Sequence, residues 1–111
     1  YLPEARKRLV PLAHSKNRIV KAESLKLLSL IHKRAGQWEE AVNIWEIMII
    51  NDPGDCFALI ELAKWCEHQA RNFHRAKILV KRAIESTQTE KEKESLRYRL
   101  DRLQRYNNVN S

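Results

Sequence analysis

The feature that most constrains the fold of this chain is a residue pattern that occurs nearly twice within residues 25–84. Leu28 and Leu62 are 34 residues apart, whereas Ala41 and Ala76 are 35 apart, so the second copy contains one additional residue before Ala76. In each copy an aromatic residue stands three positions before the alanine. A period of this length is typical of stacked helical hairpins, which serve as binding scaffolds more often than as active sites.

The composition agrees with one helical domain. A chain of 111 residues can form one modest core, and 43% hydrophobic residues with only two glycines and three prolines favour an all-α fold. The apolar run at 47–50 is too short to span a bilayer, so no membrane is expected. The chain starts at Tyr1 without a methionine or a leader, so we expect it to be a part of a longer protein.

The two cysteines indicate a reducing compartment. Cys56 and Cys66 are ten residues apart and form no CxxC motif, so neither a disulfide framework nor a zinc site is expected. Cysteines on helices are usually small buried apolar residues in reduced proteins. The expected localisation is the cytoplasm.

The net charge of +7 is unevenly distributed along the chain. Residues 1–34 contain nine Lys and Arg against two acids, whereas residues 35–67 contain one against seven. The regions 68–87 and 88–111 are again basic. These segments either neutralise each other when the helices stack or leave a basic surface for an acidic partner.

Apolar periodicity and helix-stop signals predict six helices. Pro11 is expected to kink or end the first helix, because proline removes a hydrogen bond. Gly36 is expected to end the second helix, and Asp55 to cap the fourth, after the turn at 51–55. Thr89 has capping-box spacing to Glu92. The helices are predicted at residues 1–10, 19–34, 37–50, 56–70, 73–86 and 90–106.

The apolar faces indicate how these helices are arranged. The helix at 37–50 is apolar almost all around its last turn and is expected to be the most buried. Ala41 is expected where the two helices of the first hairpin cross most closely. The first helix is expected to have an apolar stripe of Leu2, Ala5, Leu9 and Leu12. The resulting units are an N-terminal cap at 1–18, repeats at 19–54 and 55–88, a capping helix at 89–106 and a frayed tail at 107–111.

These features resemble the tetratricopeptide repeat over about residues 22–87. Ala41, Trp45 and Pro53 match the second helix and the end of the family's repeat, and Leu28-Ser29 stands where the family has leucine and glycine. His32 replaces the usual tyrosine, and Met48 replaces an alanine. The resemblance implies antiparallel helical hairpins stacked in a short right-handed superhelix with terminal capping helices.

The chain also resembles the helical C-terminal region of bacterial ribonuclease-H-like (DnaQ-type) exonuclease proteins of the YprB kind. The matching segments are 36–42 with Trp45-Glu46, then 61–64, Glu67-His68, Asn72-Phe73 and Ala76. This resemblance implies a helical appendage to a nuclease domain outside these residues.

The tetratricopeptide resemblance places a concave surface on the first helix of each hairpin. Basic side chains on this surface would attract an acidic peptide, a neighbouring domain or a phosphate backbone, although a solvated helix face explains the same lysines. In tetratricopeptide modules that bind the C-terminal carboxylate of a chaperone, asparagines and basic residues form a carboxylate clamp. Leu30 and Glu61 stand at the corresponding positions here, so no such clamp is expected. The candidate partner-binding residues are Lys26, Leu30, Lys33, Arg34, Ile60, Lys64, His68, Arg97 and Arg105.

The sequence contains no pattern for catalysis or for a bound metal. No two of His14, His32, His68 and His74 have the i, i+4 spacing of a helical metal site, and no nucleophile, phosphate loop or carboxylate pair stands out. We therefore expect a non-enzymatic protein-interaction module without cofactors, which binds its partner through a basic concave face. The alternatives are a nucleic-acid-contacting accessory region of an exonuclease and a structural module for self-association.

Overall fold

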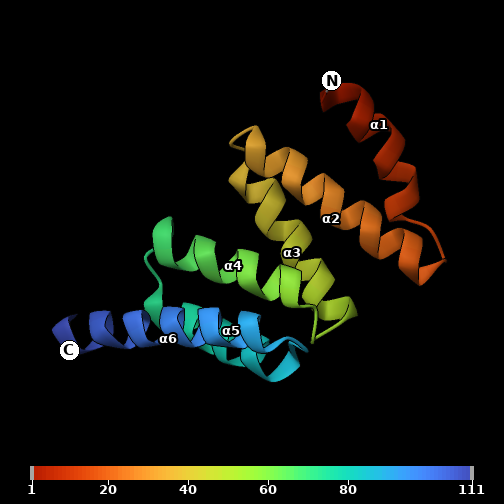
Figure 1. Cartoon of the computed structure of the whole chain (residues 1–111). Coiled ribbons are helices and arrows are strands. Elements are labelled where there is room, and N and C mark those ends of the chain that lie inside the picture. Colours follow the sequence, from red (N-terminus) through yellow and green to blue (C-terminus); the bar gives the residue numbers. More distant parts are fainter. Residues whose placement is uncertain (1, 111) are drawn as a thin grey trace. The chain divides into compact units, whose positions relative to one another are not determined.

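The computed structural model describes residues 2–110, and side chains within residues 4–106. This part of the chain contains six helices and no strand, which confirms the predicted all-α fold (Figure 1). The helices are α1 (Leu2–Ala13), α2 (Arg18–Arg34), α3 (Trp38–Asn51), α4 (Cys56–His68), α5 (Phe73–Ser86) and α6 (Glu90–Asn110). They form an N-terminal unit, residues 1–51, and a C-terminal unit, residues 52–111. The predicted superhelical stacking relates one unit to the other and stays a prediction.

The helix α1 differs from the predicted segment in its end and in its buried side. It continues through Pro11 to Ala13, because proline in a last turn removes a single hydrogen bond and the chain leaves the helix two residues later. Leu12, expected on the apolar stripe, is 45% exposed, and Ala13 is buried instead. Ala13 continues the four-residue spacing of the half-buried Ala5 and Leu9. Leu2 lies outside the residues whose side chains are described.

The helix α2 packs against both α1 and α3. Asn17 caps its start, where its Oδ1 accepts hydrogen bonds from the backbone N–H groups of Ile19 and Val20 at 3.0 and 3.2 Å. Gly36 follows its end with φ +73°, as predicted. The side chains that face inward are Ser24, Leu25, Leu28, Ser29 and His32.

The helix α3 is not the most buried helix of the chain. Ala41, Trp45 and Met48 are buried, but Ile47 is 44% exposed and Ile50 is 78% exposed. The last turn of α3 is apolar almost all around, so one of its sides remains exposed. The most buried helix is α4, in which Ala58, Leu59, Leu62, Ala63, Cys66 and Glu67 are all buried.

The helices of the C-terminal unit begin at side-chain caps. Oδ1 of Asp55 accepts from the Ala58 N–H at 3.2 Å, as predicted for α4. Asn72 caps α5 in the same way, and the Thr89 hydroxyl accepts from the Glu92 N–H at 3.3 Å at the start of α6. The helix α5 packs against both α4 and α6.

Two helix ends in this unit differ from the prediction. The helix α4 ends at His68 rather than at residue 70, because the chain turns through Arg71 in a left-handed conformation. The helix α6 continues to Asn110, since the stretch after residue 106 contains neither glycine nor proline. The side chains of the predicted frayed tail, 107–111, lie outside those described.

Candidate interaction surfaces

The predicted basic residues of α2 share one side of that helix. Lys26, Leu30 and Lys33 follow one another at spacings of four and three residues, and Lys26, Leu30 and Arg34 at spacings of four, which places them on neighbouring turns. Arg34 is exposed and the other three are half-buried. The face lies beside the buried side of the helix, which is formed by Ser24, Leu25, Leu28, Ser29 and His32.

The predicted residues of α4 also share one side of their helix. Ile60, Lys64 and His68 are four residues apart, and His68 is exposed. The ammonium group of Lys64 lies 3.8 Å from a carboxylate oxygen of Glu61. The α2 residues belong to the N-terminal unit and the α4 residues to the C-terminal unit, so each set is described by itself.

The predicted arginines of α6 are both exposed. They are eight residues apart, with Asp101 midway between them, and therefore share a face. Arg105 forms an ion pair with Asp101 at 3.6 Å, whereas the guanidinium groups that reach α4 belong to two other arginines, Arg99 and Arg102.

These two arginines meet a buried carboxylate that the sequence did not single out as a site. Glu67 on α4 is 1% exposed. Its oxygens accept two hydrogen bonds from Arg102, at 2.9 and 3.0 Å, and one from Arg99 at 2.9 Å. The imidazole Nε2 of His68 lies 3.7 Å from the same carboxylate. We call Glu67, Arg99 and Arg102 the arginine cluster.

The arginine cluster keeps Glu67 charged in spite of its burial. Burial alone would raise the pKa of Glu67, but the hydrogen bond and charge of Arg102, with the charges of His68 and Arg99, hold that pKa below its ordinary value. The hydrogen bond to Glu67 in turn raises the pKa of Arg102. Two guanidinium groups face one carboxylate, so the cluster keeps an excess positive charge.

The cluster extends the predicted basic face of α4. Glu67 lies seven residues after Ile60 and three after Lys64, hence on the same side of the helix. Arg99 and Arg102 are 22% and 32% exposed, so both reach the surface there. The three-residue spacing of the two arginines was the available signal in the sequence, but their shared partner, 32 and 35 residues away, could not be identified without the fold.

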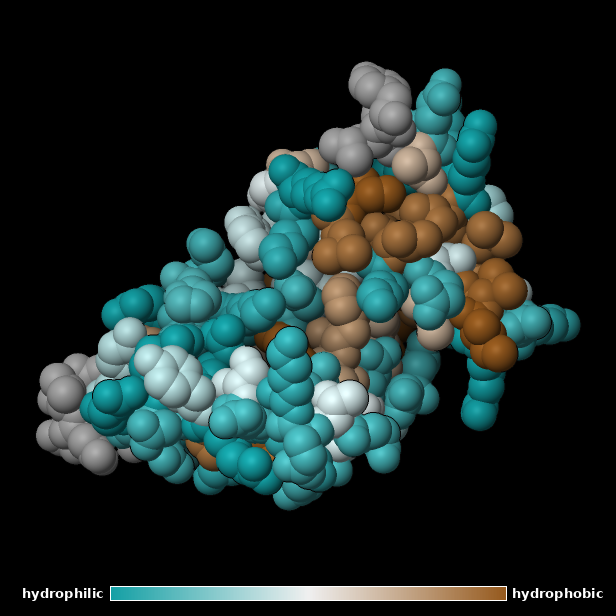
Figure 2. Space-filling view, in the orientation of Figure 1, coloured by the Kyte–Doolittle hydropathy of each residue, from teal (hydrophilic) through white to brown (hydrophobic). Residues whose placement is uncertain are grey.

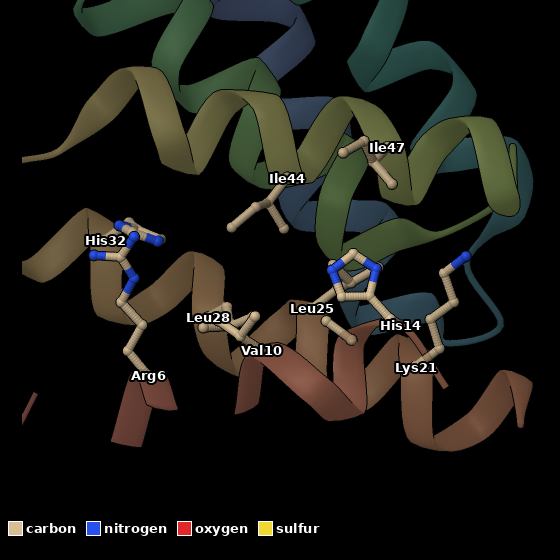
Figure 3. A pocket seen from close by; sticks show the side chains of 10 residues that line it. Arg6, Val10, His14, Lys21, Leu25, Leu28, His32, Ile44 and Ile47 are labelled. Atoms are coloured by element: carbon tan, nitrogen blue, oxygen red, sulfur yellow. The ribbon is translucent and has the colours of Figure 1, made fainter. Parts of the chain in front are cut away.

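The N-terminal unit contains a second surface feature, a largely apolar pocket of about 290 Å³ that is lined by residues of α1, α2 and α3 and by His14. Figure 3 shows Ile44 on α3 pointing toward Leu28 and Val10 across this space, with Ile47 farther along the same helix. The apolar lining is completed by Ala13 and Leu25, and the polar lining consists of Arg6, His14, Lys21 and His32. We call this pocket the α1–α3 groove.

Among the polar residues that line the groove, His32 forms a hydrogen bond with Gln37. Its Nδ1 lies 2.7 Å from Oε1 of Gln37. An amide oxygen only accepts, so Nδ1 donates the proton and, in the neutral ring, Nε2 remains as an acceptor. The side chain is buried, and this bond joins the end of α2 to the residue before α3.

Exposed aliphatic side chains gather on the same unit. Figure 2 shows apolar residues clustered over α1–α3, whereas the visible face of the C-terminal unit is largely hydrophilic. Surface apolar clusters of this kind are frequent at protein-interaction sites. The exposed aliphatic residues of the N-terminal unit are Val10, Leu12, Ile19, Leu27, Ile47 and Ile50.

The described residues contain neither a cluster of metal ligands nor a helix that could span a membrane. Among them no three His, Cys, Asp or Glu side chains converge as metal ligands. No helix in the described range has the length and apolar character needed to cross a membrane. Both cysteines are free thiols.

Comparison with known proteins gives one partial similarity. The chain is 37% identical over 82 residues to the uncharacterized protein YprB of Bacillus subtilis (strain 168), in a match that covers 70% of this chain. The chain spans about a fifth of the length of that relative, 20%. No protein-family model matches the chain, and no solved structure gives a significant match. The similarity to YprB agrees with the expected resemblance, whereas membership of the tetratricopeptide family stays a prediction.

Proposed function

We propose that this chain is a non-enzymatic, tetratricopeptide-like interaction module that binds an acidic peptide or a neighbouring acidic domain. The observation that carries the proposal is the arginine cluster beside Lys64 and His68. A single buried carboxylate fixes two guanidinium groups at the surface of α4, so less conformational entropy is lost when they bind an anion. The helical hairpins and the two free thiols suit a scaffold in a reducing compartment such as the cytoplasm.

The second candidate is an accessory region that contacts nucleic acid beside a nuclease domain. It is supported by the net charge of +7 and by the resemblance to exonuclease proteins of the YprB kind. The third candidate, structural self-association, is supported by the exposed aliphatic side chains of the N-terminal unit. The arginine cluster favours an anionic partner over self-association.

One titration series separates these candidates. Fluorescence anisotropy is measured with a labelled poly-glutamate peptide and with single- and double-stranded oligonucleotides, over a range of salt concentrations. We expect the peptide to bind, and the Lys33→Glu/Lys64→Glu variant to weaken binding at least about tenfold. The control variant Lys81→Glu/Lys91→Glu makes the same charge change at two exposed lysines that are not among the candidate binding residues.

The other outcomes would replace the proposal. Oligonucleotide binding that is tighter than peptide binding, falls steeply with salt and is lost in Lys33→Glu/Lys64→Glu would establish the nucleic-acid role. Equal losses in the test and control variants would show that total charge, not Lys33 and Lys64 in particular, is responsible. A molecular mass that increases with concentration, with no binding of either probe, would favour self-association.

A further inference from the structure

We propose that the α1–α3 groove binds an acidic amphipathic helix of a partner protein. This inference rests on the proposed interaction role but uses other residues, on a unit that does not contain the arginine cluster. The groove combines an apolar lining with a basic rim, and none of its residues was predicted as a binding residue from the sequence.

The dimensions of the groove fit a helix better than a small molecule. Its volume of about 290 Å³ lies at the lower limit of small-molecule sites. Its lining on α2 extends from Lys21 to His32, which is roughly 16 Å, or three turns, at 1.5 Å per residue. A helix that lies in a groove presents apolar anchors at i, i+3 or i+4, and i+7, which span about 10 Å and fit within this length.

The lining of the groove is suited to such anchors. Val10 and Ile47 line opposite sides, on α1 and α3, and are 40% and 44% exposed. Leu25 and Leu28, on α2, are 7% and 5% exposed and form a closed apolar base. An apolar side chain of the partner placed between Val10 and Ile47 would remove the exposed surface of both residues from water, and this burial favours association.

The charges around the groove select an acidic partner. Arg6 and Lys21 line it, together with His14, and its lining includes no Asp or Glu. Residues 1–34, which contain both cations, have a net charge of +7, with nine Lys and Arg against two acids. A helix with carboxylates beside its apolar stripe would place them against these cations, and a basic helix would be repelled.

The test uses the full chain and a designed helical probe. A fluorescein-labelled peptide of about 14 residues has Phe and Leu at i, i+3, i+4 and i+7 and Glu elsewhere, and a second peptide has Lys in place of Glu. Binding is followed by anisotropy for the unaltered chain, Ile47→Glu and Ile78→Glu. Ile78 is the matched control, because it is 45% exposed and lies on α5, in the other unit. Circular dichroism confirms that each variant is helical.

We expect the acidic peptide to bind, Ile47→Glu to weaken binding at least about tenfold, and Ile78→Glu to leave it unchanged. Arg6→Glu is expected to weaken the acidic peptide and to strengthen the basic one. The inference is overturned by absence of binding at millimolar peptide, by equal losses in both isoleucine variants, or by equal binding of the two peptides. A dimer that Ile47→Glu dissociates would also overturn it, because the occupant would then be a second copy. Loss of peptide binding in Lys33→Glu/Lys64→Glu but not in Ile47→Glu would leave the proposed function standing without this groove.

Discussion

At the scale of single residues, the repeat places a left-handed backbone position in both hairpin turns. Gly36 has φ +73° and Arg71 has φ 56°, and these two positions are 35 residues apart, like the two repeat alanines. Glycine adopts this conformation freely, whereas a side chain adds strain of about 1 kcal/mol. The Arg71 guanidinium lies over the ring of Phe73, 4.9 Å from its centroid, and this contact offsets part of the strain.

We therefore predict that Arg71→Gly is more stable than Arg71→Ala by about 1 kcal/mol. Both variants lose the guanidinium, so their difference reports the backbone strain, less the larger conformational entropy that glycine has in the unfolded chain. Urea unfolding followed by circular dichroism gives both free energies of unfolding. Gly36→Ala provides the reverse control, with an expected loss of about 1 kcal/mol, because a Cβ there meets nothing within 4 Å and only the backbone conformation opposes it. Equal stability of the two Arg71 variants would contradict the assigned strain.

The thiol of Cys56 is expected to react slowly in the folded chain. Burial raises its pKa, and the carboxylates of Glu92 and Asp55 raise it further, against a smaller lowering by a hydrogen bond with Thr87. Its Sγ also lies 3.8 Å from the carbonyl oxygen of Ala83, to which the thiol donates. Since the thiolate is the nucleophile, alkylation by iodoacetamide near neutral pH should be at least about tenfold slower than in urea. Peptide mass spectrometry measures both rates, and similar rates would refute the prediction.

At the scale of elements, the arginine cluster fastens α6 to α4. Arg102 donates two hydrogen bonds to Glu67 and Arg99 donates one. Removal of Arg102 leaves a buried carboxylate with one hydrogen-bonded cation, so Arg102→Ala should cost about 3 kcal/mol, and Arg99→Ala should cost less. The exposed Arg97 on the same helix is the control, with an expected change within about 0.5 kcal/mol. Urea unfolding measures the free energy of unfolding of all three variants. An unchanged free energy for Arg102→Ala would show that the cluster does not stabilise the fold.

The same cluster predicts a loss of stability in acid. The pKa of Glu67 is lowered from its ordinary value of 4.5 in the folded chain, so the unfolded chain binds this proton more readily. Its stabilising contribution is therefore complete above that ordinary value and is lost as the pH falls through the folded pKa. Glu67→Gln, which does not titrate, should show a smaller difference in unfolding free energy between pH 7 and pH 3. Parallel pH profiles of the two proteins would contradict this assignment.

The first hairpin depends on a small residue at Ala41. This side chain is 0% exposed on α3, in the unit where α2 and α3 pack together. The larger side chain of Ala41→Leu has no free space there, so overpacking should destabilise the chain by roughly 1–3 kcal/mol. Ala22→Leu makes the same change at an exposed position of α2 and should be nearly neutral. An unchanged urea midpoint for Ala41→Leu would exclude this close packing.

At the scale of the whole molecule, the sequence predicted the helices better than the chemistry between them. Periodicity and caps are local, so the all-α fold, Gly36 and Asp55 followed from neighbouring residues. The arginine cluster depends on residues more than 30 positions apart, and the α1–α3 groove on three helices at once. Local patterns do not determine either, because a charge or an apolar side chain on a helix does not indicate which residue of another helix it meets.

The two units should differ in their ability to fold alone. The buried apolar residues of the N-terminal unit are Ala13, Leu25, Leu28, Ala41, Trp45 and Met48, and the indole Nε1 of Trp45 has no hydrogen-bond partner among the described residues. The C-terminal unit buries nearly twice as many, including Leu59, Leu62, Leu79, Leu96 and Leu103, and adds the arginine cluster. An unpaired buried donor costs about 1–3 kcal/mol, and short chains are marginally stable.

We therefore predict that residues 52–111 alone form a helical protein with a cooperative thermal transition, whereas residues 1–51 alone have reduced helicity and melt without one. Circular dichroism of the two fragments during heating is the measurement. Leu62→Ala in the longer fragment should lower its midpoint strongly, because a buried leucine truncated to alanine costs about 2–5 kcal/mol. Cooperative melting of both fragments would show that α1–α3 form a sufficient core, with the exposed aliphatic residues of that unit left free for a partner. Absence of a cooperative thermal transition in both fragments would show that each unit needs the other to fold.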